Sequence, residues 1–408
     1  MSNSDSEKGI DTIAPVRTSG SIEVTKADNT NESFEVFKKG EGTVDFRTVG
    51  WIHASVIFLK VIFATGVLSI PSAMFVLGAL PGAINVLGWQ FLNTYCAIIQ
   101  GNFRNTHAGC HSIADMAYVV GGVWLREIVG VLFLVTYAIV AASGIFGSSV
   151  GLNVLSSHAI CTNWFMLVAT IAVFGLASVR KFEKIAWLTW AGFLSVYIAV
   201  FIVVVGVTTR DRPAAAPRTG DFELGYHVIG NPTFVTGITS VATIFCSGAG
   251  TSAFLPVISE MRKPRDYNKA VYLCMGIVTA SYLTFSLVVY RYCGQWVASP
   301  SLGSAGHVVK KVAYGIGLIG LLVSACLYVH VAAKYMFVRI LRNSEHLQKN
   351  SAGRWWQALV YYLNCLMIAL AAFLTIGGTY GVVQNIIDAY ASGEIGGAFS
   401  CADNSDSS

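Results

Sequence analysis

The chain has 408 residues, of which 54% are hydrophobic and only 12% are charged. A soluble domain carries about 25% charged residues, so this composition excludes a soluble globular protein and predicts an all-α integral membrane protein. The net charge of +5 is not the footprint of a nucleic-acid partner, because in a membrane protein the placement of the positive charges matters.

The first 47 residues are rich in Ser, Thr, Asp, Glu and Asn, which predicts a disordered tail and no cleavable signal peptide. We expect a transmembrane domain over residues 48–387 and a short extracytoplasmic tail over residues 388–408. Within this domain nine stretches are apolar enough to cross a bilayer, although the fourth is short. They are residues 49–77, 80–101, 127–150, 163–179, 184–208, 234–258, 269–292, 311–338 and 356–387.

Lys and Arg gather on one side of the predicted membrane. With a cytosolic N-terminus, the inner segments hold 19 of the 27 Lys and Arg residues and the outer segments hold six. Since cytoplasmic loops carry an excess of positive charge, residues 1–47 are predicted to be cytosolic and the loop 209–233 to lie outside.

The first span contains a feature that a simple membrane anchor would avoid. Within residues 57–74, Thr65 and Gly66 are followed by Pro71. Glycine and proline weaken the helical hydrogen-bond ladder halfway across the membrane. Such a break is tolerated only against protein or a water-filled cavity, so it marks a candidate solute site.

A second interrupted helix follows about 180 residues later, at residues 235–257. Its polar and helix-breaking residues are Ser247, Gly248, Gly250, Thr251 and Pro256. Free N–H groups at Thr65–Gly66 suit a carboxylate, and free carbonyls at the second break suit a cation such as an α-ammonium group. The alternative for a single glycine is close helix packing, but two breaks in corresponding positions favour a transporter site.

Two lysines lie within predicted spans. Lys60 is near the middle of the first span, where membrane burial penalises its charged form. We weigh two roles for it equally: a proton-coupling group, or a structural lysine that hydrogen-bonds carbonyls exposed by the breaks. Lys334 is near the cytoplasmic end of its span, so we expect it to snorkel towards water.

Other motifs favour structural roles. Residues 314–320 read YGIGLIG and match GxGxxG, but they lie inside an apolar span, which favours helix packing over dinucleotide binding. His107, Cys110 and His111 lack a fourth ligand for zinc, so we expect no metal. Cys161, Cys293 and Cys401 all fall outside, where a disulfide among them could form. We find no nucleophile–base arrangement, so we do not expect an enzyme.

Three segments carry a resemblance to a known family. The first span contains ATGVLSIP, and the second interrupted helix, FCSGAGTSAFLPVIS, is followed by EMRKPRDYNKA. The chain then ends with GGTYGVVQNIIDAYASGEIGGAFSCADNS and a few further residues. Together these segments resemble the amino acid/auxin permease family, and most of all its fungal neutral amino acid permeases, over nearly all of residues 45–408.

The resemblance implies a leucine-transporter-type fold, in which two inverted five-helix repeats enclose the substrate between broken helices one and six. It implies proton symport of a neutral amino acid, bulky or aromatic, across the plasma membrane rather than the vacuolar membrane. No cofactor is expected besides the proton as coupling ion, and the expected partners are the amino acid and the lipid bilayer. The site residues that it implies are Thr65, Gly66 and Val67 for the carboxylate, Phe245, Ser247, Gly248 and Gly250 for the ammonium group and side chain, and Tyr137 and Tyr328 for the pocket wall.

The sequence departs from the family near its end. Members usually have eleven spans, whereas here residues 342–354 (RNSEHLQKNSAGR) run from the eighth helix directly into one that resembles the last. We therefore expect nine spans, with the second repeat shortened by two. Two functions stay open: a permease, or a non-transporting permease-like protein that acts as an amino acid sensor or modulates full-length relatives.

Overall fold

The computed structural model describes residues 47–63, 66–177, 182–217 and 219–341. Over these ranges the chain is helical and forms no β-sheet, apart from an isolated parallel bridge between Val49 and Met261. The helices are α2 (Trp51–Ile62), α3 (Ile70–Leu77), α4 (Ala79–Thr106), α5 (Ile113–Ser156), α6 (Thr162–Ala177), α7 (Phe182–Thr208), α8 (Phe234–Gly248), α9 (Phe254–Ile258), α10 (Tyr267–Cys293) and α11 (His307–Leu341). The last predicted span and both predicted tails lie outside the described residues, except for Arg47.

The helices suit a membrane in length and in what they expose. Five helical stretches are long and apolar enough to cross a bilayer, or six when the bent pair α2–α3 is taken as one span. Phe91, Trp124 and Trp187 are 77%, 84% and 79% exposed, respectively. In water such apolar surface would be a liability, whereas acyl chains cover it in a bilayer. An all-α membrane protein is confirmed, and the nine-span count and the inverted repeats stay predictions.

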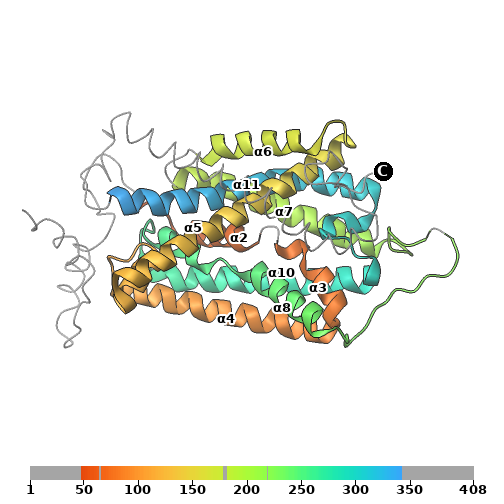
Figure 1. The fold of residues 1–408 in the computed structure, drawn as a ribbon, viewed down its shortest axis with the longest axis horizontal. Helices are drawn as coiled ribbons and strands as arrows, with labels where there is room; N and C mark the ends of the chain where they lie inside the picture. The colour runs from red at the N-terminus through yellow and green to blue at the C-terminus, as the bar shows by residue number, and fades with distance from the viewer. Residues whose placement is uncertain (1–46, 64–65, 178–181, 218, 342–408) are drawn as a thin grey trace, which may run out of the picture.

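The helices form two packed groups. α11 packs along α5, α7 and α6, while α10 packs along α2 and α4. In Figure 1, α4 and α6 lie at opposite edges, α5 crosses the other helices obliquely, and α2 and α3 lie between the two groups. Contacts of α2 and α10 with α7 connect the groups, so the first broken span lies where they meet, and α3 packs on α8 of the second broken span.

Both predicted breaks are present. α2 ends at Ile62, and the chain resumes through a short 3-10 helix, η2 (Gly66–Leu68), into α3, with a bend of 44°. α8 ends at Gly248 and is followed by a second 3-10 helix, η3 (Thr251–Ala253), and by α9. Gly250 has a φ of +134°, which L-residues with a side chain rarely adopt, so glycine is required at this point of the break.

The third span differs from its predicted bounds, because α5 begins at Ile113 rather than near residue 127. Ser112 caps it: its side chain accepts from the backbone N–H of Asp115, whose carboxylate in turn accepts from the backbone of Ser112. Gly121 and Gly122 have non-helical dihedrals, so the extension joins the span at a kink. Polar residues and glycines obscure this extension in the sequence.

The glycines of the GxGxxG segment pack helices, as predicted. A Cβ on Gly320 would lie 2.2 Å from Val196 Cγ2 and 2.6 Å from the carbonyl oxygen of Gly192. A Cβ on Gly317 would lie 3.2 Å from Ala199 Cβ. All three neighbours belong to α7, so these glycines let α11 approach α7 closely.

Candidate functional site

The two breaks touch each other. A Cβ on Gly66 would lie 2.7 Å from Ser247 Cα and 2.8 Å from the carbonyl oxygen of Ser247. The hydroxyl oxygens of Ser69 and Ser247 are 3.3 Å apart. Residues 181 positions apart in the sequence, Gly66 and Ser247, are therefore in backbone contact, and the contact exists because residue 66 has no side chain.

Three buried tyrosines donate to backbone carbonyl groups at the two breaks. Tyr328 Oη on α11 donates to the carbonyl oxygen of Val61 at 2.6 Å. Tyr137 Oη on α5 donates to that of Gly250 at 3.3 Å and lies 2.9 Å from Ser252 Oγ. The rings of Tyr137 and Tyr328 have centroids 6.2 Å apart, so both tyrosines lie at the breaks, and their role in a pocket wall stays a prediction.

The third tyrosine, Tyr282 of α10, was not predicted. Its hydroxyl lies 2.8 Å from the carbonyl oxygen of Ile62 and 3.0 Å from that of Ser247, one at the end of each half-helix. A phenol has a single proton to donate, so the two carbonyls share one donor. Tyr282 thereby links the two breaks, and no pattern around position 282 distinguishes it from a packing tyrosine.

In the predicted cation site, the carbonyl groups already have hydrogen-bond donors. The carbonyl groups of Ser247 and Gly250, expected to be free for an α-ammonium group, accept from Tyr282 and Tyr137 here. A charged ammonium donor makes a stronger hydrogen bond than a neutral phenol does. A substrate ammonium group at this position would therefore displace one or both hydroxyls.

The remaining predicted site residues are placed as follows. Thr65 lies outside the described residues, and Val67 is buried at the start of η2. Phe245 is 39% exposed and packs edge-on against Trp89 of α4, with ring centroids 4.9 Å apart, on a different side of α8 from Ser247. Gly248 packs against Gln90 of α4 rather than against the tyrosines, since its Cβ would lie 2.2 Å from Gln90 Nε2.

Lys60 is fully buried in α2, and its Nζ has no hydrogen-bond partner among the described residues. A Cβ on Gly192 would lie 3.2 Å from Lys60 Cε, so the side chain extends towards α7. The structural role weighed for it, donation to carbonyls at the breaks, is not seen: the carbonyls of Val61 and Ile62 accept from tyrosines instead.

One end of the molecule is closed by residues 48–50 and 260–262, which we call the Val49 end. The backbone N–H of Val49 donates to the carbonyl oxygen of Glu260 at 3.0 Å, and that of Arg262 donates to Val49 at 2.9 Å. Glu260 also forms an ion pair with Lys334 of α11, in which both side chains are almost fully buried. The expectation that Lys334 snorkels is wrong, because a carboxylate 74 residues earlier in the sequence pairs with it.

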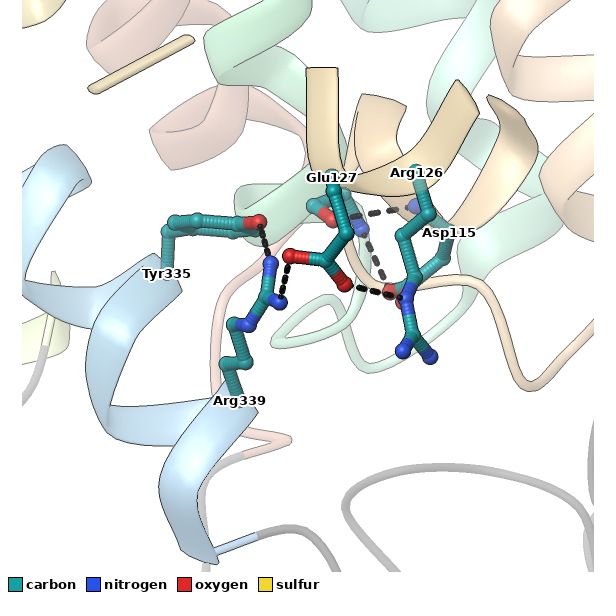
Figure 2. Close-up of polar contacts among 6 residues, drawn as sticks. Asp115, Arg126, Glu127, Tyr335 and Arg339 are labelled. Atoms are coloured by element: carbon teal, nitrogen blue, oxygen red, sulfur yellow. Dashed lines mark hydrogen bonds and ion pairs between the residues drawn. The ribbon is translucent and has the colours of Figure 1, made fainter. Parts of the chain in front are cut away.

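A more exposed polar cluster joins α5 to α11 (Figure 2). Glu127 lies between two guanidinium groups, forming an ion pair with Arg339 and another with Arg126, whose Nε is 3.3 Å away. Arg339 also donates to Tyr335 Oη at 2.7 Å. The side chains of Glu127 and Arg339 are 42% and 36% exposed, so this cluster contributes little to stability.

The other residues singled out in the sequence take structural positions. His107 stacks on Phe103, with ring centroids 4.3 Å apart, and His111 Nδ1 lies 3.2 Å from Ser259 Oγ. Cys161 is disulfide-bonded, Cys293 is a free thiol, and Cys401 lies outside the described residues.

Comparisons with known proteins identify the family of the chain. The family described as "Transmembrane amino acid transporter protein" matches residues 47–379. A "Transmembrane transporter" of Gibberella moniliformis is 42% identical, and the match covers 92% of each chain. An "N amino acid transport system protein" of Neurospora crassa is 25% identical, with 89% of this chain and 90% of the relative covered.

Proposed function

This chain belongs to the transmembrane amino acid transporter family, and we propose that it moves neutral amino acids, bulky or aromatic, by proton symport with alternating access. The observation that carries the proposal is the direct contact between two broken spans, at Gly66 and Ser247. Broken half-helices that meet inside a bundle place helix ends of both signs around one point, which suits a zwitterion. The proposed location is the plasma membrane, with the N-terminus in the cytosol.

The two breaks have different roles in the proposed site. The N-terminal end of η2, at Gly66 and Val67 with the preceding Thr65, would receive the substrate carboxylate. The carbonyl groups at Ser247 and Gly250 would receive the ammonium group in place of the tyrosine hydroxyls. Substrate binding would then release Tyr137 and Tyr282 from the breaks, which couples occupancy of the site to the geometry of both half-helices.

A second function, that of a non-transporting sensor or modulator, is favoured by one finding. The alignments with the fungal relatives extend over 434 positions, more than the 408 residues of this chain, so the relatives contain residues that have no counterpart here. This is consistent with the expected loss of two spans after residue 348. Alternating access moves one repeat against the other, so a shortened repeat would impair transport more than binding.

Uptake of labelled neutral amino acids separates the two functions. The chain would be expressed in cells lacking their own permeases, beside a version with two family-like spans inserted after residue 348. Equal, saturable and pH-dependent uptake by both versions supports a transporter that is complete with nine spans. Uptake only by the extended version supports the sensor or modulator, and uptake by neither version contradicts the proposed transport function.

The proposed topology predicts which side of the membrane each end of the chain occupies. With an impermeant thiol reagent and intact cells, a cysteine at Ala215, which is exposed in the loop after α7, should be labelled. A cysteine at Ser21 should be labelled only after permeabilisation, because the 19-to-six split of basic residues predicts a cytosolic N-terminus. Labelling of Ser21→Cys but not of Ala215→Cys in intact cells would reverse the assignment.

Proton coupling is predicted to depend on Lys60. The amine of Lys60 is buried and has no hydrogen-bond partner among the described residues. The free energy of protonating such an amine depends on the groups around it, and these change when a substrate binds or the helices move. Lys60→Gln should therefore flatten the pH dependence of uptake. Lys269→Gln serves as the control, because this lysine is exposed and pairs with Asp266 at the surface. An unchanged pH profile in Lys60→Gln would make the lysine structural.

A further inference from the structure

The buried face of α4 carries two carboxamide residues, Gln90 and Asn93, and near its C-terminal end Arg104, among small and apolar residues. The buried residues of this helix recur every three or four positions, which defines one face, and they are Ala79, Gly82, Val86, Gln90, Asn93, Ala97, Gly101 and Arg104. Gln90 and Asn93 lie near its middle, at the level of the break between α8 and α9. Residues 80–101 of α4 are a predicted span, and a helix inside a membrane rarely places two carboxamides on a packed face without a partner for them.

Both side chains are aimed at the break. A Cβ on Gly248 would lie 2.2 Å from Gln90 Nε2 and 3.2 Å from Asn93 Nδ2, so the two amides lie against the last residue of α8. Gln90 is 1% exposed and Asn93 is 9% exposed. Gly248 leaves room for them, and this explains the glycine without a substrate contact.

The amides are not saturated in this arrangement. Gln90 Oε1 and Asn93 Nδ2 are buried and have no hydrogen-bond partner among the described residues. On its other sides the same break is held by hydrogen bonds, since Tyr282 donates to Ser247 and Tyr137 donates to Gly250. An acceptor and a donor facing a backbone segment are complementary to one peptide group, which offers an N–H and a carbonyl oxygen.

We propose that Gln90 and Asn93 are positioning residues that hydrogen-bond the backbone of residues 248–250 when the second broken span changes conformation during transport. The inference rests on the proposed function for the existence of that second conformation. In the conformation described here the two amides have polar atoms without partners, which raises its free energy. In the alternative conformation they would hydrogen-bond the backbone of residues 248–250, which lowers the free energy of that conformation. Residues 260–262 follow directly after α9, so movement of the second broken span moves one half of the Val49 end. We therefore take the alternative conformation, which the two amides favour, to be the one in which the Val49 end is open.

The direction of this shift between the two conformations can be tested without measuring transport. Gln90→Met and Asn93→Leu keep side-chain size and remove the polar atoms, so each should shift the equilibrium towards the closed Val49 end. Ser55 is fully buried in α2 near this end, so a cysteine there reacts with a thiol reagent only when the end opens. The labelling rate of Ser55→Cys is measured after subtraction of the rate in the same protein without this cysteine. It should fall roughly 5- to 150-fold in each variant, the factor expected when a buried polar group loses its partner.

The matched control is Gln100→Met, on the same helix and with an equally unpartnered Oε1 among the described residues, but about 15 Å along the axis from Gln90. It should leave the labelling rate unchanged. If Gln90→Met fails to reach the membrane, Gln90→Asn, which retains a carboxamide, replaces it and should label close to wild type while Asn93→Leu does not. Labelling of the Met and Leu variants that equals or exceeds the wild-type rate overturns the proposal, whereas loss of uptake by the wild type overturns only the proposed transport function.

Discussion

Substitution of Gly66 by valine is expected to abolish amino acid binding and uptake while the protein still reaches the membrane. The position admits no side chain, because a Cβ would lie 2.7 Å from Ser247 Cα, and backbone cannot move aside as a flexible side chain can. The two breaks would separate by about 1 Å or more, a displacement that costs on the order of 100-fold when groups must converge on one ligand. Binding to purified protein and uptake by cells both measure this loss.

A matched control comes from α4. Gly88 is exposed on a lipid-facing side and a Cβ there meets nothing within 4 Å, so Gly88→Val should bind and transport as the wild type does. Gly250→Val should resemble Gly66→Val for a different reason, since its φ of +134° excludes a β-branched side chain. Wild-type binding by Gly66→Val would mean that the contact between the breaks serves helix packing only.

The breaks could be predicted because their causes are local. Glycine and proline weaken a helix wherever they occur, and Thr65–Pro71 and Ser247–Pro256 contain both in otherwise apolar stretches. The surrounding helices followed from hydrophobic length alone. The start of α5 was missed because its first turns depend on a capping box and cross a glycine kink, neither of which an apolar window detects.

The partners of the site could not be predicted, because they come from distant parts of the chain. Tyr282 reaches a carbonyl oxygen 220 residues away at Ile62, and neither position carries a pattern that refers to the other. Phe245 and Ser247 are two residues apart on α8 and therefore point in different directions, so one packs on Trp89 and the other on the first break. A contiguous sequence motif does not tell which of two such neighbours faces the site, because that depends on how the surrounding helices pack.

The partner of the charged residue Lys334 could not be predicted from the sequence either. Its position near the end of an apolar helix indicates snorkelling, in which the ammonium group reaches the nearest water. The structure provides a carboxylate instead, because the loop after α9 folds back at the Val49 end and brings Glu260 against α11. The EMRKPRDYNKA segment, which carries the family resemblance, supplies this carboxylate as its first residue.

Removal of one member of the Glu260–Lys334 pair is expected to destabilise the protein strongly, while removal of both is not. Their side chains are 1% and 3% exposed, so Lys334→Met leaves a carboxylate, and Glu260→Leu an ammonium group, in a buried and poorly solvated position. Breaking a buried pair in this way costs about 3–5 kcal/mol. Replacement of both partners by apolar residues of similar volume is often neutral or even stabilising, so the double variant should recover most of the loss.

Thermal unfolding of the purified variants measures these differences, and Arg339→Met is the matched control. Arg339 belongs to the same helix and also pairs with a glutamate, Glu127, but the two side chains are more than a third exposed (Figure 2). A pair of that kind contributes about 0–1 kcal/mol, so the control should unfold near the wild-type temperature. Single variants at Glu260 and Lys334 that are as stable as the control would show that water reaches the pair.

The double variant also separates stability from gating. The ion pair attaches the segment that follows α9 to α11, and the same segment holds residues 48–50 through backbone hydrogen bonds. Without the pair, the folded protein should open its Val49 end more often, so a cysteine at Ser55 should be labelled faster than in the wild type. This is opposite in direction to the effect expected for Gln90→Met, and the two substitutions act on different sides of the broken span. If the double variant is as stable as the wild type and is labelled faster, the ion pair holds the Val49 end closed. If it is as stable and is labelled at the wild-type rate, the ion pair is a structural contact only.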